Sequence, residues 1–261
     1  MPNDFLHSFQ GEWLKRKRSL ASWIVVIGGF FTPTIIIIAR LVNYEQLAAL
    51  YAKADFWTSL WQSSWESMAI FLLPLGVVLS TSLITQIEYK NNSWKQLHTV
   101  PLNFSTIFFT KLLVIIAMLL QFFILFNIGI YLSAVIPWLL GSGVAYPAAT
   151  FPYKYFLQEN ALYFIDCLPI LALQYLLGLQ YKNFLVPVGT GFILWVGALA
   201  ALSWKYGYLV PYTYCMYNHL KTAAPGKAAI PALNIHYMAV FYFILFTAAS
   251  FIIYITKKEK G

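Results

Sequence analysis

The chain has 261 residues, of which 60% are hydrophobic and only 10% are charged, and its mean hydropathy is +0.68. A soluble globular protein carries about 25% charged residues because water covers its surface, so this composition excludes an ordinary soluble domain. The net charge of +8 would suggest nucleic-acid binding in a soluble protein. In a membrane protein it first reports topology, because basic residues concentrate on the cytoplasmic side. We therefore expect a multi-pass protein of the cell membrane, with lipids and no nucleic acid as partners.

Six apolar segments are long enough to cross a bilayer, whose core of about 30 Å needs roughly 20 apolar residues in a helix. They are residues 19–39, 67–87, 107–136, 160–180, 184–203 and 237–256. Their length argues against the short alternating strands of a membrane barrel. The first follows a basic run but is too long for a signal peptide and lacks a small-residue cleavage site, so we expect it to be retained. The predicted fold class is an all-α membrane protein with six transmembrane helices in one domain, residues 1–261.

The basic residues orient these helices. With the N-terminus inside, 11 of the 17 Lys and Arg residues fall in inner segments and 6 in outer ones. The positive-inside rule therefore predicts that both termini are cytoplasmic.

The N-terminal segment 1–18 has the pattern of an interfacial helix. Phe5, Phe9 and Trp13 are spaced by four residues and share one helical face. Glu12 and the run Lys15-Arg16-Lys17-Arg18 supply its charge. Such a segment is expected to lie on an anionic leaflet.

The sequence lacks the common motifs of nucleotide-binding and catalytic sites. It contains no phosphate-binding loop, no HExxH and no GxSxG motif. The four histidines are scattered over both predicted sides, so they cannot share one metal, and no acid–base pair is evident within the membrane. Cys167 and Cys215 have no metal-ligand spacing, and two buried thiols are favoured over a disulfide. We expect a protein that is not an enzyme and holds no cofactor or metal.

Asp166 is the one carboxylate well inside a predicted span. An intramembrane acid is costly and suggests a proton or substrate site. The alternative is a hydrated side chain near the outer interface, since Glu159 lies one heptad earlier on the same face. Both readings stay open.

Polar residues within two other spans are candidates for a transport path or a subunit interface. They are Ser80, Thr81, Ser82, Thr85, Gln121 and Asn127. Simple packing is equally compatible, because small hydroxyl residues let membrane helices approach closely. Six helices rarely enclose a pore, so we expect a second membrane subunit, identical or related.

The segment 88–106 carries a family resemblance. It begins with Glu88, continues through a polar stretch with Trp94 and Leu97, reaches Pro101, and is followed by Lys111 at the start of the third span. This resembles the cytoplasmic segment of ABC-2 type transporter permeases. The N-terminal stretch Phe9 to Ser19 looks like that family's interfacial helix, and the branch of lantibiotic-immunity and bacitracin-type permeases is the most similar in size and pattern.

The resemblance implies that segment 88–106 is a coupling helix that contacts a separate ABC ATPase, which would hold the ATP and Mg. Trp94 and Leu97, three residues apart, would present one apolar edge to a groove on that partner. Charged residues at the rim would fix the orientation, and Pro101 would end the helix. The coupling residues are Glu88, Tyr89, Lys90, Trp94, Lys95, Leu97 and Pro101. Alternatively, Trp94 anchors in the headgroup layer.

The leading hypothesis is the permease subunit of an ATP-driven exporter of an amphipathic or hydrophobic compound, such as an antimicrobial peptide or a drug, giving immunity or resistance. The alternatives are an ion-coupled carrier without an ATPase, in which Asp166 would be central, and a membrane-embedded enzyme that modifies lipids.

Overall fold

The computed structural model describes residues 2–17, 19–90, 103–140, 144–223 and 233–256, and these ranges contain helices and connecting loops but no strand. The main helices are α1 (Pro2–Arg16), α2 (Leu20–Val42), α3 (Leu47–Tyr51), α4 (Phe56–Ser67), α5 (Leu73–Lys90), α7 (Phe104–Leu140), α8 (Tyr153–Gln180), α9 (Leu185–Ala201), α10 (Tyr214–Ala223) and α11 (Ile235–Thr256). Single turns are η1 (Tyr44–Gln46), η2 (Met68–Leu72), η3 (Gly207–Leu209) and η4 (Pro211–Thr213).

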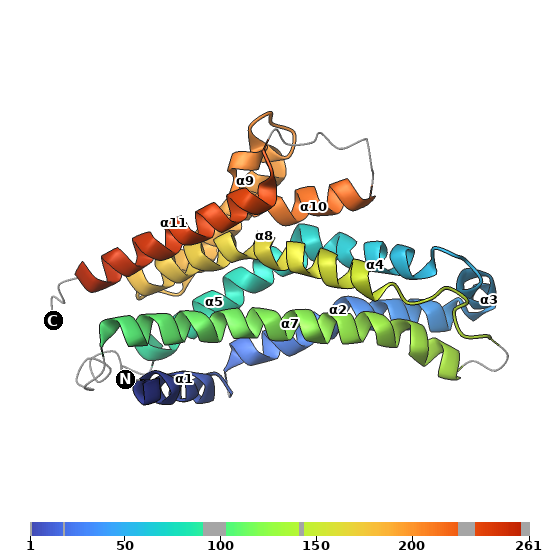
Figure 1. Ribbon diagram of the computed structural model, residues 1–261, viewed down its shortest axis with the longest axis horizontal. Coiled ribbons are helices and arrows are strands. Elements are labelled where there is room, and N and C mark those ends of the chain that lie inside the picture. Colours follow the sequence, from blue (N-terminus) through green and yellow to red (C-terminus); the bar gives the residue numbers. More distant parts are fainter. Residues whose placement is uncertain (1, 18, 91–102, 141–143, 224–232, 257–261) are drawn as a thin grey trace.

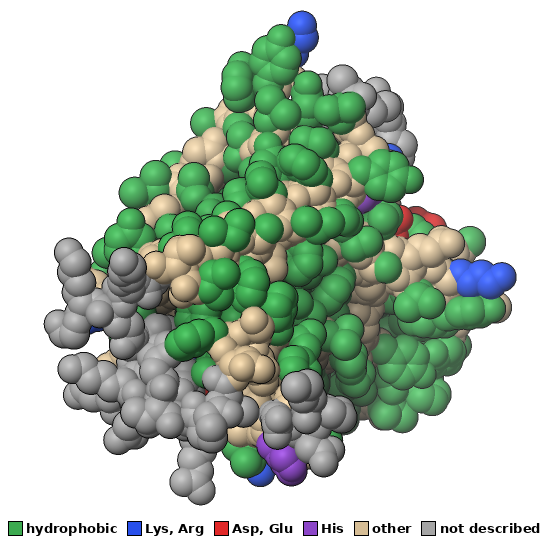
Figure 2. Space-filling view, turned by 60° about the vertical axis from the view of Figure 1, so that its left-hand side comes forward, with side chains coloured by type: hydrophobic (Ala, Val, Ile, Leu, Met, Phe, Trp, Pro, Cys, Tyr) green, Lys and Arg blue, Asp and Glu red, His purple; other side chains and the backbone are tan. Residues whose placement is uncertain are grey.

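The described residues form five helices long and apolar enough to cross a membrane, together with the shorter apolar helix α9. This confirms the all-α membrane fold with about six spans. Hydrophobic side chains cover most of the visible face, and charged side chains are few (Figure 2). Lipid rather than water suits such a surface.

The helices run roughly along one axis, and α1 begins and α11 ends at the same end of the bundle (Figure 1). We call this the terminal end, and the opposite end the α3 end. The end of α5, the start of α7 and the turn between α8 and α9 also lie at the terminal end. The terminal end therefore brings α1 together with the two helix ends that flank residues 91–102.

The helix of the second span begins earlier than residues 67–87, because α4 continues through η2 into α5. Polar residues make α4 less apolar, but Trp57, Trp61 and Trp65 repeat every four residues and form one buried face. The π-helical turn η2 ends two residues before Pro74, which has no N–H for the carbonyl of Ile70. The indole of Trp195 on α9 donates to that carbonyl instead, at 2.8 Å.

Helix α7 organises the packing. Its 37 residues span about 55 Å, which is longer than a bilayer core, and different neighbours cover its two halves. Phe251 and Tyr254 of α11 contact Phe108 near its start. Toward its second half, α2 approaches closely, since a Cβ added at Gly129 would lie 2.7 Å from Pro33. The absence of a side chain at Gly129 thus permits the contact between α2 and α7.

Candidate functional site

Helix α1 lies lengthwise against the first half of α7 (Figure 1). Ser8 and Thr110 are joined by a hydroxyl hydrogen bond of 3.1 Å, and Arg16 donates to the Gln121 side chain at 2.6 Å. Because both pairs advance in the same direction, the two helices run parallel. The sequence predicted a helix in this segment, and the structure adds the surface on which it packs.

Glu12 connects α1 to a buried cation on α7. Its carboxylate pairs with Lys15 in the next turn and lies 3.8 Å from the ammonium group of Lys111. Lys111 is only 2% exposed and Glu12 only 8%. A buried charge needs an opposite charge or hydrogen bonds, so Glu12 fixes α1 against α7.

The predicted aromatic face of α1 is divided. Phe9 and Trp13 stack at 6.0 Å and pack against the core, whereas Phe5 is exposed. The guanidinium group of Arg16 lies 3.5 Å from the centre of the Trp13 ring, a cation–π geometry. Burial lowers the pKa of Arg16 from its usual range. Two of the three aromatics therefore contribute to the packing of α1, and contact of α1 with a leaflet stays a prediction.

The predicted coupling segment is described only at its start. Trp94, Lys95, Leu97 and Pro101 lie outside the described residues, while Glu88 and Lys90 are in the last turn of α5. The hydroxyl of Tyr89 donates to the carbonyl of Leu179 at 3.0 Å.

A second hydrogen bond joins the same two regions. The amide of Gln86 donates to the carbonyl of Tyr181 at 2.7 Å. The end of α5, from which the segment departs, is thus fastened to the end of α8 and its turn into α9.

Asp166 lies inside the protein rather than in water. Its side chain is 0% exposed, and the ring Nδ1 of His236 lies 2.8 Å from its Oδ1. The sequence alone did not show this acid–base pair, which forms because α8 and α11 pack together and join residues 70 positions apart. His236 is the second residue of α11, and nothing in its sequence neighbourhood identified Asp166 as its partner.

Further polar groups surround this pair. Four buried oxygen atoms there have no hydrogen-bond partner among the described residues: Glu159 Oε2, Asp166 Oδ2 and the hydroxyls of Tyr163 and Tyr214. Tyr163 interacts electrostatically with Glu159 and Asp166, and Tyr214 with Asp166. We call Glu159, Tyr163, Asp166, Tyr214 and His236 the polar cluster of α8, α10 and α11. Buried oxygens of this kind usually bind water, so the cluster can hold water or a proton.

Metal binding has no support in the described residues, where no three His, Cys, Asp or Glu side chains are grouped closely enough to hold a metal ion.

Cys167 on α8 and Cys215 on α10 are buried free thiols with their sulfur atoms 3.4 Å apart. Burial also lowers the pKa of His219 on α10, although Glu66 opposes this shift. The helix α10 is therefore embedded among α4, α8 and α11.

Most of the polar residues proposed for a path are occupied in packing. Asn127 and Asn160 exchange two amide hydrogen bonds of 2.8 Å between α7 and α8. Ser82 lies 3.5 Å from the Gln174 oxygen, and Gln121 accepts the bond from Arg16. Ser80 and Thr81 differ, because they line a cavity.

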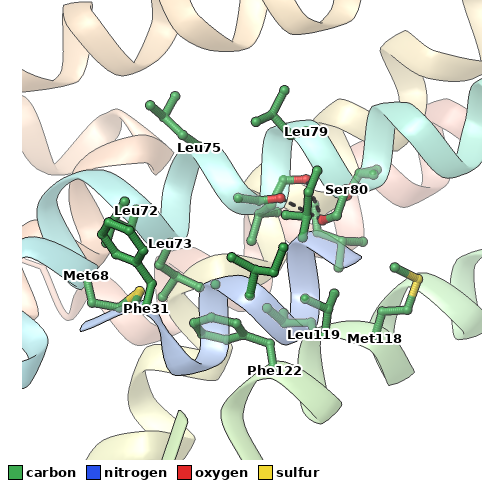
Figure 3. Close-up of a pocket in the computed structure, with 18 of the residues that line it drawn as sticks. Phe31, Met68, Leu72, Leu73, Leu75, Leu79, Ser80, Met118, Leu119 and Phe122 are labelled. Atoms are coloured by element: carbon green, nitrogen blue, oxygen red, sulfur yellow. Dashed lines mark hydrogen bonds between the residues drawn. The ribbon is translucent and has the colours of Figure 1, made fainter. Parts of the chain in front are cut away.

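This cavity was not anticipated from the sequence. It has a volume of about 420 Å³ and lies between α2, η2, α5 and α7. Leu75, Leu79 and Ser80 of α5 border one side, across from Leu119 and Phe122 of α7 (Figure 3). A cavity at this position places an apolar binding space within the helices of the membrane domain.

Comparison with known proteins identifies the family. A family model described as ABC-2 family transporter protein matches residues 8–198. No curated protein and no solved structure matches the chain. The matched range contains α1 from Ser8 onward, the whole of segment 88–106, the cavity and Asp166, and it covers well over half of the chain. The chain therefore belongs to the ABC-2 family of transporter proteins, as a multi-pass permease of the kind that works with ABC ATPase subunits.

Proposed function

We propose that this permease belongs to an ATP-driven exporter of an amphipathic or hydrophobic compound, such as an antimicrobial peptide or a drug, and that it gives resistance to that compound. Family membership carries the proposal. An export substrate of this kind would be taken from the membrane, which agrees with the apolar character of the membrane-spanning helices.

The same proposal assigns energy coupling to segment 88–106. ATP hydrolysis on the partner has to move the permease through a protein contact, and Trp94 and Leu97 supply an apolar edge for it. Motion of the segment would reach α8 and α9 through Gln86 and Tyr89. It would reach α7 directly along the chain. Two permease subunits would face each other in the complete transporter.

The test is a double substitution, Trp94→Ala with Leu97→Ala, in the chain co-expressed with its ATPase. We expect the variant to lose co-purification of the ATPase and to lose compound-stimulated ATP hydrolysis. Trp23→Ala is the matched control, because Trp23 is 63% exposed on α2, outside the segment. Full coupling in the double variant, or equal losses in the control, would contradict the role of the segment.

Substrate class is tested in cells. Survival is measured against a panel of membrane-active peptides and hydrophobic drugs, with and without the permease and its ATPase. Protection that requires both proteins supports export. Sensitivity unchanged across the panel would count against the resistance role.

An ion-coupled carrier is the second candidate, and the buried Asp166–His236 pair is the observation in its favour. The two mechanisms separate when an ionophore collapses the ion gradients while ATP is maintained. ATP-driven export continues under this treatment, whereas ion-coupled transport stops. Asp166→Asn would abolish transport by the second mechanism.

A further inference from the structure

The cavity between α2, η2, α5 and α7 is nearly uniform in chemistry. Its walls are apolar apart from two hydroxyl side chains and backbone. The lining residues are Ile24, Val25, Ile27, Gly28, Phe31, Met68, Phe71, Leu72, Leu73, Leu75, Gly76, Val77, Leu79, Ser80, Thr81, Ile115, Met118, Leu119, Phe122 and Leu171. A volume of about 420 Å³ is within the usual range for small-molecule sites. Walls of this kind match a hydrocarbon chain.

The cavity also reaches the outer surface of the helices. Three lining residues are large, apolar and exposed: Ile27 at 58%, Phe31 at 48% and Phe71 at 45%. In a membrane protein such residues face lipid. A chain can therefore enter sideways from the bilayer without crossing water.

The two hydroxyls make one side of the cavity more polar than the other. Phe31, Met68 and Leu72 gather on one side of the view, and Ser80 lies on the other with Met118 and Leu119 (Figure 3). The Ser80 hydroxyl is already satisfied, since it donates to the carbonyl of Gly76 at 2.7 Å.

Thr81, next to Ser80, is different. It is 0% exposed, and its hydroxyl has no hydrogen-bond partner in the described part of the chain. A buried hydroxyl without a hydrogen-bond partner lowers the stability of the protein. An acceptor such as an ester carbonyl on the occupant would satisfy it.

Positive charge is concentrated just beyond the hydroxyl side of the cavity. Lys15 and Arg16 end α1, and Lys17 follows them, three residues before the start of α2 at Leu20. The first lining residue, Ile24, is four residues further along that helix, or about 6 Å. Arg16 is held at Gln121, three residues from the lining residue Met118. The Nε of Arg16 is buried and has no partner among the described residues. Glu12 is the acid that faces this basic junction.

We propose that the cavity binds one acyl chain of an anionic phospholipid from the surrounding bilayer. The end of the chain packs against Met68 and Phe31, the ester carbonyl accepts from Thr81, and the phosphate lies at the basic junction of residues 15–17. Basic clusters next to membrane helices attract anionic lipids in this way. The lipid is a resident ligand, so this site does not depend on the export cargo.

The experiment uses the full-length chain in nanodiscs with phosphatidylglycerol that carries a photoreactive group near the end of one acyl chain. Cross-linked peptides are identified by mass spectrometry. We expect labelling of α2, η2 and α5 at cavity-lining residues. Labelling confined to lipid-facing residues outside the cavity would overturn the site.

Gly76→Phe fills the cavity. A Cβ added at Gly76 meets no atom within 4 Å, so the ring can extend into open space. Gly189→Phe is the matched control, because Gly189 is exposed on α9 and is equally unobstructed. We expect cavity labelling to fall about tenfold in the first variant and to stay unchanged in the second. Equal labelling in the two variants would contradict the proposal.

Two further comparisons test the polar contacts. Thr81→Val keeps the shape but removes the hydroxyl, and we expect a several-fold loss of labelling with retained thermal stability. Phosphatidylcholine with the same photoreactive chain should label the cavity less than phosphatidylglycerol, and Lys17→Gln should reduce that difference. Equal labelling by both lipids would contradict the proposed preference for an anionic headgroup. All these measurements are made without ATP or ATPase. A negative result would therefore contradict the lipid site without contradicting the proposed export function. A negative result in the export tests would likewise not contradict the lipid site.

Discussion

Several close contacts between helices each depend on one glycine, and Gly178 is an example. A Cβ added at Gly178 on α8 would come within 2.8 Å of the Thr85 Cβ on α5. Thr85 is fully buried, and its hydroxyl already donates within α5 to the carbonyls of Thr81 and Ser82. The threonine therefore cannot move away without loss of these bonds. In membranes, small residues of this kind allow close backbone approach.

Gly178→Ala is expected to lower the stability of the chain by about 1–3 kcal/mol, since extra volume in a tightly packed contact forces the helices apart. Thermal unfolding in detergent measures the effect. Gly189→Ala has the same chemistry at an unobstructed position and should leave the midpoint unchanged or slightly higher. A Gly178→Ala midpoint no lower than that control would refute the close contact between α5 and α8.

Helix α1 shows how an element acquires its position. Its aromatic spacing indicates a helix, but the spacing does not say what the helix packs on. The position follows from Lys111, which is buried inside α7 and lies near Glu12, and from the bonds of Ser8 and Arg16. An isolated helix of this length would be marginal in water. Tertiary contacts thus hold α1.

Glu12→Gln is expected to loosen α1 and to destabilise its contact with α7 by about 1–3 kcal/mol, because hydrogen bonds and pairs with charged groups contribute about this much. Limited proteolysis with trypsin measures the change, since Lys15 and Lys17 are exposed cleavage sites in or beside α1. Cleavage there should become faster. The control is Glu45→Gln, which removes the same charge at an exposed position in η1. Equal cleavage rates in the two variants would show that Glu12 does not hold the helix.

The second span illustrates the limit of a hydropathy pattern at the scale of elements. The pattern located its apolar half, 67–87, but the helix extends back to Phe56. Polar residues between the tryptophans lowered the apolar signal. Those residues are accommodated because only the tryptophan face is buried.

At the scale of the whole molecule, the features described above lie at different positions along the bundle. The terminal end holds α1, the end of α5 that leads to the coupling segment, and the turn between α8 and α9 (Figure 1). The pair Asp166–His236 lies further along α8, and the cavity lies along α2, α5 and α7. A signal from an ATPase would thus enter at the terminal end and pass along α5, α7 and α8.

The positive-inside count predicts which end is cytoplasmic, and cysteine labelling tests it. In a chain with Cys167→Ser and Cys215→Ser, we expect Lys182→Cys, in the α8–α9 turn, to react with an impermeant maleimide only after the cells are opened. Lys53→Cys, between α3 and α4, should react in intact cells. Both positions are exposed. The reverse pattern would invert the orientation and place segment 88–106 out of reach of a cytoplasmic ATPase.

The sequence by itself determined that this protein is an all-α membrane protein with about six spans. Lipid requires apolar runs of a fixed length, and this requirement is visible along the chain. The residues of segment 88–106 also pointed to the ABC-2 family, which the family match confirms.

Only the tertiary structure decided the contacts across the sequence. Asp166 and His236 are 70 positions apart, and Arg16 and Gln121 are 105 apart. The cavity exists only where five elements, α2, η2, α5, α7 and α8, leave space between them. Such features depend on which helices lie side by side and in what register. The pattern of apolar residues carries little of that information, because the membrane-spanning helices are apolar on most of their surface.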